Sequence, residues 1–265
     1  MRTVRMRIAY DGRAYFGWQR QDGFLSVQEA IEDALFDLLG DTITLHGSGR
    51  TDTGVHALGQ VAHCQVASKL GDDRLRHALN ARLGGSTVIE RLETCRDDFH
   101  ARFDARGKRY AYVIWTSRFK PPLGHGMYHW VRNSLDLGAM RQAAAAFLGE
   151  HDFQAFSNAG SVRHTTVRRI QSARLMARHN RVVFVVQGNG FLYNMVRTMA
   201  GTLIEVGTGR LDPECVNRAL QSGVRTDAGM TAPAAGLYLV KVLYNEPVFA
   251  GRDRGPHGAP GAFDF

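Results

Sequence analysis

The feature that most constrains this fold is the order in which apolar patterns follow one another along the chain. Residues 3–10 alternate apolar and polar side chains as a half-buried strand does, whereas residues 26–40 repeat apolar side chains at helical spacing. Ser26 and Glu29 are predicted to form a capping box at the start of that helix, and Gly40 to end it. Further elements are predicted as strands at 42–49, 57–67, 86–95 and 107–117 and as a helix at 72–85. The order β-α-β-β-α-β, followed by one more strand, is typical of a ferredoxin-like unit.

A similar order begins again after a break at about residues 117–130. Asp136 and Asp212 are predicted to cap helices of this second part, with Pro213 in a first turn. Its expected elements are helices at 134–149, 191–207 and 212–223, a hairpin at 165–188 and a closing strand at 236–244. The sequence therefore predicts an α+β protein of two ferredoxin-like or RRM-like halves with antiparallel sheets. The N-terminal domain covers residues 1–120, the C-terminal domain 121–245, and a Gly/Pro-rich flexible tail 246–265.

The charge balance indicates a polyanionic partner. The chain has a formal net charge of +8 and an isoelectric point near 9.7, which favour nucleic acid without reporting a fold. Basic residues also gather in two stretches; each stretch alone favours a solvated basic surface, whereas both together with the aromatic residues described below favour RNA or DNA. These residues are Arg102, Arg106, Lys108 and Arg109 in one stretch, and Arg163, His164, Arg168 and Arg169 in the other.

Cysteine usage and apolar runs favour a cytoplasmic protein without a membrane segment. No run approaches the roughly 18 apolar residues that a membrane span needs, and residues 1–12 lack the apolar core of a signal peptide. Cys64, Cys95 and Cys215 are far apart and odd in number, so we expect small buried side chains rather than disulfides.

The glycine-rich segment 46–64 carries one carboxylate, Asp52, with Arg50 two positions before it. In an extended backbone both side chains lie on one face, where the guanidinium would keep the carboxylate ionised and in place. Such a carboxylate suits nucleophilic attack on an electrophilic carbon. The alternative is an ordinary turn in which Asp52 accepts local backbone hydrogen bonds.

Two other segments suggest contact with a nucleic acid. Tyr110 and Tyr112 share one face of the strand at 107–117, either as core residues or as a platform for base stacking. Helical spacing across the glycine turn at 188–190 places Gly190, Tyr193 and Arg197 on one face. An arginine among apolar neighbours is expensive to bury alone, so a carboxylate partner is expected for Arg197, with Asp52 as the candidate.

Motifs for bound cofactors are missing from the sequence. There is no GxxxxGK[ST] phosphate loop, no HExxH, and no cysteine pair at zinc spacing. His56 and His63 follow Asp52 closely in the sequence, but one carboxylate is too few for the usual hard-metal chemistry. We therefore expect no metal here, and His56 is expected to cap or pack locally.

The segment “GSGRTDTGVHALGQVAH” resembles the signature of the tRNA pseudouridine synthase A family. The resemblance extends over residues 7–244 and includes “AYDGRAYFGWQRQ”, “SVQEAIEDAL”, “FHARFDARGKRYAYVIW”, “FSNAGSVRHTTVRRI”, “GNGFLYNMVRTMAGTLIEVG” and “TAPAAGLYLVKVLY”. It implies an isomerase that converts uridine to pseudouridine at positions 38, 39 and 40 of the tRNA anticodon stem-loop. It also implies a homodimer without cofactors, and a basic catalytic cleft between the two halves.

The resemblance assigns roles residue by residue. Asp52 matches the catalytic aspartate, Arg197 its basic partner, Tyr110 the tyrosine that stacks on the target base, and Arg50 the arginine that assists entry of the flipped nucleotide. Whether Asp52 attacks C1′ or C6 stays open. The remaining expected substrate contacts, to phosphates, are Lys108, Arg109, Arg168 and Arg169.

Two other kinds of protein remain as alternatives. A non-catalytic RNA-binding module or RNA chaperone would need the basic and aromatic residues but not the arrangement of Asp52 with its two arginines. A metal-dependent nuclease would cut strands and respond to chelators.

Overall fold

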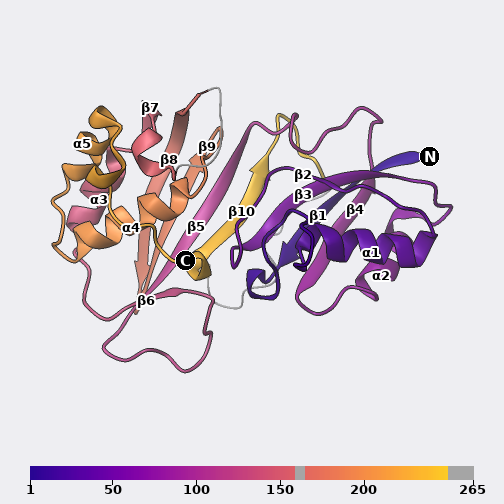
Figure 1. Cartoon of the computed structure of the whole chain (residues 1–265), viewed down its shortest axis with the longest axis horizontal. Helices are drawn as coiled ribbons and strands as arrows, with labels where there is room; N and C mark the ends of the chain where they lie inside the picture. Colours follow the sequence, from indigo (N-terminus) through magenta and orange to yellow (C-terminus); the bar gives the residue numbers. More distant parts are fainter. Residues whose placement is uncertain (159–164, 250–265) are drawn as a thin grey trace. The chain divides into compact units, whose positions relative to one another are not determined.

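The computed structural model describes residues 1–158 and 165–249 of the 265-residue chain. These residues form mostly antiparallel strands and five α-helices, which confirms the predicted α+β class (Figure 1). They divide into two compact units. Of the described residues, unit 1 contains Met1–Arg106 and residues 238–249, and unit 2 contains those between Gly107 and Leu237.

The sheet of unit 1 has the strand order β4-β1-β3-β10, with the short β2 also paired to β3. Its elements are β1 (Arg2–Tyr10), η1 (Gly12–Ala14), α1 (Val27–Leu39), β2 (His46–Gly47), β3 (His56–Val66), α2 (Asp72–Asn80), β4 (Thr87–Thr94) and β10 (Leu237–Leu243). β10 runs parallel to β3, and the other pairings are antiparallel. A Cβ on Gly59 would lie 2.5 Å from the carbonyl oxygen of Val240, so this glycine lets β10 approach β3 closely.

The core of unit 1 lies between this sheet and the helices α1 and α2, which Figure 1 shows next to each other. Alternate residues of β1 and the apolar face of α1 are fully buried there, as the two periodicities predict. The capping box is confirmed: Ser26 Oγ accepts from the Glu29 amide, and the Glu29 carboxylate accepts from the Ser26 amide. Gly40 ends the helix with φ 76°, which glycine adopts without strain.

The sheet of unit 2 has the strand order β5-β9-β8-β7, with β6 parallel to β5. Its elements are β5 (Gly107–Thr116), β6 (His129–Val131), α3 (Leu137–Ala145), β7 (Gly149–Asp152), η2 (Gln154–Phe156), β8 (Val167–Arg178), β9 (Arg181–Gly188), α4 (Met195–Gly207), α5 (Cys215–Ser222), η3 (Arg225–Asp227) and η4 (Ala234–Gly236). The predicted hairpin is confirmed by the antiparallel pairing of β8 with β9, and the predicted cap by Asp136, which accepts from the Ala139 amide.

The two compact units do not coincide with the ranges expected for the domains. β5 follows β4 in sequence and falls in the range predicted for the N-terminal domain, but it pairs along its length with β9 of unit 2. β10 falls in the range predicted for the C-terminal domain, but it pairs with β3 of unit 1. Both differences concern strand pairing between distant segments. The ferredoxin-like topology of each half and the cleft between the halves stay predictions.

Several elements are shorter than predicted, among them the helices expected at 72–85 and 134–149, and three others are shorter for identifiable local reasons. The strand expected at 42–49 shrinks to β2 because Leu45 pairs its N–H and C=O with Glu32 and Gln28 of α1. The helix expected at 191–207 begins only at Met195, since Asn194 has φ 59°.

The last predicted helix begins at Cys215, beyond Pro213. Asp212 accepts from the Glu214 amide just ahead of that helix instead of capping it. Of the expected tail, residues 250–265 lie outside the described residues.

Candidate active site

The Asp52 loop, residues 48–55, connects the paired strands β2 and β3 in unit 1. His46 lies opposite His63, and the Ser48 amide continues the pairing by donating to the carbonyl of Val61 at 2.7 Å. The loop closes with a turn in which the Val55 amide donates to the carbonyl of Asp52 at 3.1 Å. Asp52 is half-buried. This turn places Asp52 at the start of a hydrogen-bonded reversal.

A buried glutamine, Gln60 of β3, supports the loop from inside. Its side-chain carbonyl accepts from Ser48 Oγ at 2.6 Å and from the Val61 amide at 3.1 Å. Its Nε2 donates to the carbonyl of Gly49 at 2.9 Å. Because a buried polar group left without a partner costs about 1–3 kcal/mol, these bonds favour the single loop conformation in which all of them are made. The first part of the Asp52 loop is thus held to the strand beneath it.

Tyr10 and the segment after β1 hold the next part of the loop. The Tyr10 hydroxyl lies 2.7 Å from Thr51 Oγ1, and burial raises the pKa of this phenol, which stays protonated. The Trp18 amide donates to the carbonyl of Thr51 at 3.1 Å. Gly17 has φ 90°, and a Cβ there would lie 2.6 Å from the Thr51 carbonyl oxygen and 3.3 Å from the Asp52 carbonyl carbon. Only glycine allows this approach.

Arg50 is exposed, and its guanidinium is oriented by the segment that precedes α1. Its Nε donates to Oε1 of Gln19 at 3.1 Å, and Gln19 donates in turn to Gln28 of α1 at 2.7 Å. Gln28 donates to the buried carboxylate of Glu32 at 2.9 Å. A chain of hydrogen bonds therefore connects Arg50 to α1. The predicted effect of Arg50 on the ionisation of Asp52 stays a prediction.

His56 follows the loop and packs locally, as expected. It is buried, its ring stacks on Tyr238 at a centroid distance of 4.7 Å, and its Nδ1 accepts from the Gly12 amide at 3.1 Å. Asp11 Oδ1 lies 3.3 Å from the same nitrogen. Hydrogen bonds from Arg13 lower the pKa of Asp11. These contacts give His56 a structural role at the base of the loop.

In unit 2, Tyr110 lies near the start of β5. It is 7% exposed, and Phe191 contacts its ring edge-on at a centroid distance of 5.1 Å. Tyr112 is fully buried and donates to the carbonyl of Pro233 at 2.8 Å, which makes it a core residue. The two tyrosines share a face of β5, but Tyr110 is the one near the connection from β9 to α4. Phe191 fixes the plane of its ring.

Arg197 lies in the first turn of α4 and is half-buried. Its Nε donates to the carbonyl of Ala232 at 2.8 Å, and its Nη1 donates to Oδ1 of Asn194 at 2.9 Å. The expected helical face shared with Gly190 and Tyr193 is wrong, because both residues precede the helix. Pairing of Arg197 with a carboxylate of unit 1 stays a prediction.

The expected phosphate contacts lie at the same end of the unit 2 sheet. Lys108 pairs with Gly188, and Arg109 donates to Gln187 at 2.7 Å through Nη2. Arg168 donates to the carbonyl of Val167 at 2.6 Å and would contact a Cβ on Gly190. The Arg169 side chain is exposed, and its amide donates to Asn189. Unit 2 thus gathers these residues around the β9–α4 connection, while Arg163 and His164 lie outside the described residues.

Comparisons with known proteins identify the kind of enzyme. The family model described as tRNA pseudouridine synthase matches residues 6–104 and 143–245. The chain belongs to the tRNA pseudouridine synthase family. Among curated relatives, the tRNA pseudouridine synthase A of Acetivibrio thermocellus is 46% identical over 245 residues, covering 92% of this chain and 100% of the relative. Those of Caldicellulosiruptor bescii and Syntrophotalea carbinolica are 42% and 46% identical over 244 residues, covering 92% of this chain and 100% and 97% of the relatives. The resemblance seen in the sequence is confirmed, and the enzyme is an isomerase.

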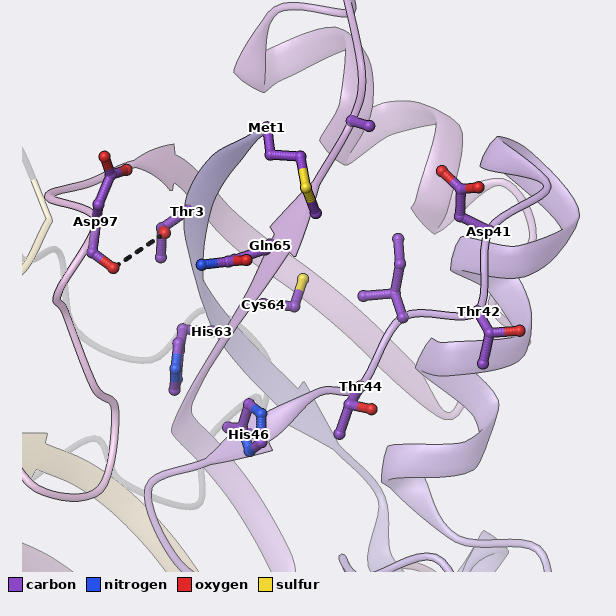
Figure 2. A pocket seen from close by; sticks show the side chains of 12 residues that line it. Met1, Thr3, Asp41, Thr42, Thr44, His46, His63, Cys64, Gln65 and Asp97 are labelled. Atoms are coloured by element: carbon purple, nitrogen blue, oxygen red, sulfur yellow. Dashed lines mark hydrogen bonds between the residues drawn. The ribbon is translucent and has the colours of Figure 1, made fainter.

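A cavity in unit 1 of this pseudouridine synthase lies away from the expected site residues. It has a volume of about 600 Å³, and Figure 2 shows His46, His63 and Gln65 around it, with Thr3 donating to the carbonyl of Asp97. None of the expected catalytic or substrate-binding residues lines it. Among residues 1–158 and 165–249, no group of three or more His, Cys, Asp or Glu side chains is arranged to hold a metal. Within the same residues, no helix is long and apolar enough to cross a membrane.

Sequence reasoning missed the residues that support the Asp52 loop. Gln60 stands in the apolar run of β3, and a polar amide in such a run is a signal of a buried hydrogen-bonding role. Tyr10 ends β1 and carries no comparable signal, because its contact with Thr51 depends on strand pairing between distant segments. Gly17 was part of the resemblance, yet its close approach to the loop is visible only in three dimensions.

Proposed function

We propose that this pseudouridine synthase isomerises uridine to pseudouridine in tRNA, at positions 38, 39 and 40 of the anticodon stem-loop, with Asp52 as the nucleophile. The observation that carries the proposal is the way in which the Asp52 loop is held. Gln60 and Trp18 bond to its backbone at Gly49 and Thr51, Tyr10 bonds to the Thr51 hydroxyl, and Asp52 in the same loop is half-buried. Relatives named tRNA pseudouridine synthase A, at 42–46% identity over nearly the whole chain, support tRNA as the substrate.

The reaction conserves atoms. The N1–C1′ glycosidic bond breaks, the uracil rotates, and a C5–C1′ bond forms, after which C5 loses a proton and N1 gains one. Asp52 attacks C1′ or C6 and is released unchanged when the new bond has formed. As the nucleophile, Asp52 acts in its carboxylate form. We expect no metal or organic cofactor to take part.

The target uridine must leave the helical stack before Asp52 can reach it, at a cost of a few kcal/mol. Arg50 is exposed and directed by Gln19, which suits an arginine that assists the entering nucleotide. Tyr110 stacks on the uracil during its rotation, with its ring held by Phe191. Arg197 completes the proposed catalytic group as the basic partner of Asp52.

Phosphate contacts from the basic residues around the β9–α4 connection supply much of the affinity. The proposed contacts are Lys108, Arg109, Arg168 and Arg169. We also propose a homodimer in the cytoplasm, in which each chain has two ferredoxin-like halves that flank a basic cleft.

The test is tritium release from tRNA that carries uridine labelled at C5. The native enzyme is compared with Asp52→Asn and with Asp37→Asn, a control at an exposed position of α1. We expect release at the anticodon arm from the native enzyme and from Asp37→Asn, and none from Asp52→Asn despite unimpaired tRNA binding. Product formation by Asp52→Asn would refute the nucleophile. Binding without release by the native chain would favour an RNA-binding module, and chelator-sensitive strand scission a nuclease.

A further inference from the structure

Three exposed apolar side chains gather on the segment that precedes α1. Phe16, Phe24 and Leu25 are 49%, 50% and 52% exposed. The two phenylalanine rings lie 4.7 Å apart between centroids at an interplanar angle of 48°, and the Phe16 amide donates to the carbonyl of Leu25 at 2.9 Å. Adjoining exposed apolar side chains are a common mark of an interaction site. We call these three residues the Phe16–Phe24 platform.

The platform is fixed by buried neighbours. Tyr15 and Trp18, on either side of Phe16 in sequence, are both buried. The Val27 amide donates to the carbonyl of Gly17 at 3.1 Å, which joins the segment to the first turn of α1. A bridge between Gln21 and Phe24 closes the reversal that brings the two rings together. The fold therefore holds the two rings in contact with solvent. Because exposed apolar surface is unfavourable in water, a ligand that covers the rings would gain free energy from their burial.

The segment that carries the platform packs against the Asp52 loop. Gly17, the residue after Phe16, is the glycine that lies against Thr51 and Asp52. Gln19, three residues after Phe16, is the acceptor for Arg50. A ligand that reaches the Asp52 loop in unit 1 thus has the platform within its immediate surroundings.

We propose that the Phe16–Phe24 platform binds an unpaired base of the RNA strand next to the target uridine. This inference rests on the proposed function. Aromatic side chains bind bases of any sequence by stacking, because every base has a π-face. Exposed Arg50 stands in the neighbouring Asp52 loop to attract the strand's phosphates, whereas Arg20 is paired with carboxylates of α1. A base that loses its stacking neighbour when the uridine flips out would find a replacement on Phe24 or Phe16.

The size of the platform favours a base over a protein partner. Stable protein interfaces take roughly 20–30 residues from each side, whereas this surface has three apolar residues and then the charged Arg20 and Asp22. Stacking without base-specific hydrogen bonds also suits an enzyme that modifies three neighbouring positions in different sequences. The platform would then lower the cost of flipping without restricting the sequence.

Phe24→Ala is the principal test, because Phe16 directly precedes the constrained Gly17. Phe36, 52% exposed on the surface of α1, provides the matched control Phe36→Ala. We expect kcat/KM for tRNA to fall about 5- to 50-fold in Phe24→Ala, to stay within about twofold of native in Phe36→Ala, and to be restored in Phe24→Trp. The slope of log Kd against log salt concentration should be unchanged in Phe24→Ala, since stacking releases no counterions.

A second measurement tests the contact itself. Anticodon stem-loops with an abasic nucleotide on the 5′ or the 3′ side of the target uridine are compared with the intact RNA. We expect one of the two abasic RNAs to abolish the difference between native enzyme and Phe24→Ala, as a shared contact requires. A Phe24→Ala effect that persists on both abasic RNAs, or an alanine variant as active as native, would overturn the inference.

The outcomes also separate this inference from the proposed function. If native enzyme releases tritium and Phe24→Ala does so equally well, only the platform fails. If the native enzyme releases none, the proposed function fails first. A change in size-exclusion elution for Phe24→Ala, with kcat/KM unaffected, would assign the platform to contact between copies of this chain and refute the base contact.

Discussion

Replacing Gly17 by alanine tests how the Asp52 loop is held. Gly17 has φ 90°, and its new Cβ would lie 2.6 Å from the carbonyl oxygen of Thr51. A left-handed conformation costs an L-residue about 1–2 kcal/mol, and overpacking adds about 1–3 kcal/mol. We therefore expect the free energy of unfolding to fall by about 2–5 kcal/mol. The neighbour is backbone, so the Thr51–Asp52 segment itself must move by several tenths of an ångström.

That movement should appear in catalysis as well as in stability. A displacement of about 1 Å in a reacting group can lower the rate about 100-fold. We expect kcat of Gly17→Ala to fall about 10- to 100-fold, measured by tritium release under conditions where the variant is fully folded.

Gly40→Ala is the matched control, since Gly40 has φ 76° but nothing within 4 Å of the new Cβ. It should lose about 1–2 kcal/mol of stability and keep native kcat. Urea unfolding of both variants measures the stability. Equal losses of stability and equal kcat in the two variants would refute the idea that Gly17 positions the loop.

Other predictions concern the supports of the loop and a buried histidine. Gln60→Leu leaves the Ser48 hydroxyl and the Gly49 carbonyl unpaired, so the free energy of unfolding in urea should fall by about 2–3 kcal/mol. Gln65 is exposed on the same strand, so the control Gln65→Leu should lower it by less than about 0.5 kcal/mol. Equal losses in the two variants would contradict the supporting role of Gln60. Tyr10→Phe, which removes the bond to Thr51, should cost about 1 kcal/mol in the same assay; an unchanged midpoint would argue against that bond. Burial and neighbouring histidines lower the pKa of His63 to about 4, below its value in the unfolded chain. The contribution of neutral His63 to the free energy of unfolding is therefore complete above the unfolded pKa and is lost as the pH decreases toward 4. Between pH 7 and pH 5 we expect the free energy of unfolding to fall by an amount on the order of 1–2 kcal/mol. A His63→Gln variant with the same pH dependence would refute His63 as the source of this loss.

Much of this protein follows from local sequence patterns. The capping box of Ser26 and Glu29 and the hairpin of β8 and β9 depend on residues close together in the chain, and both are confirmed. The family was also evident from the sequence, because its motifs around Asp52 and through the rest of the chain are specific, and the relatives confirm it. The roles of Asp52, Tyr110 and Arg197 remain predictions from that resemblance.

The features that only the tertiary structure determines are contacts between segments that are distant in the sequence. Propensity predicts that β5 and β10 are strands, but their partners are selected by burial against segments far away in the chain. The left-handed Asn194 shortened a helix that apolar periodicity alone would have extended. The support of Asp52 by Gln60, Tyr10 and Gly17 likewise arises only after β1, β3 and the segment before α1 have packed together. Local sequence predicts Asp52 as the reacting residue, whereas long-range packing determines what holds its loop, because buried polar groups find their partners only in the folded chain.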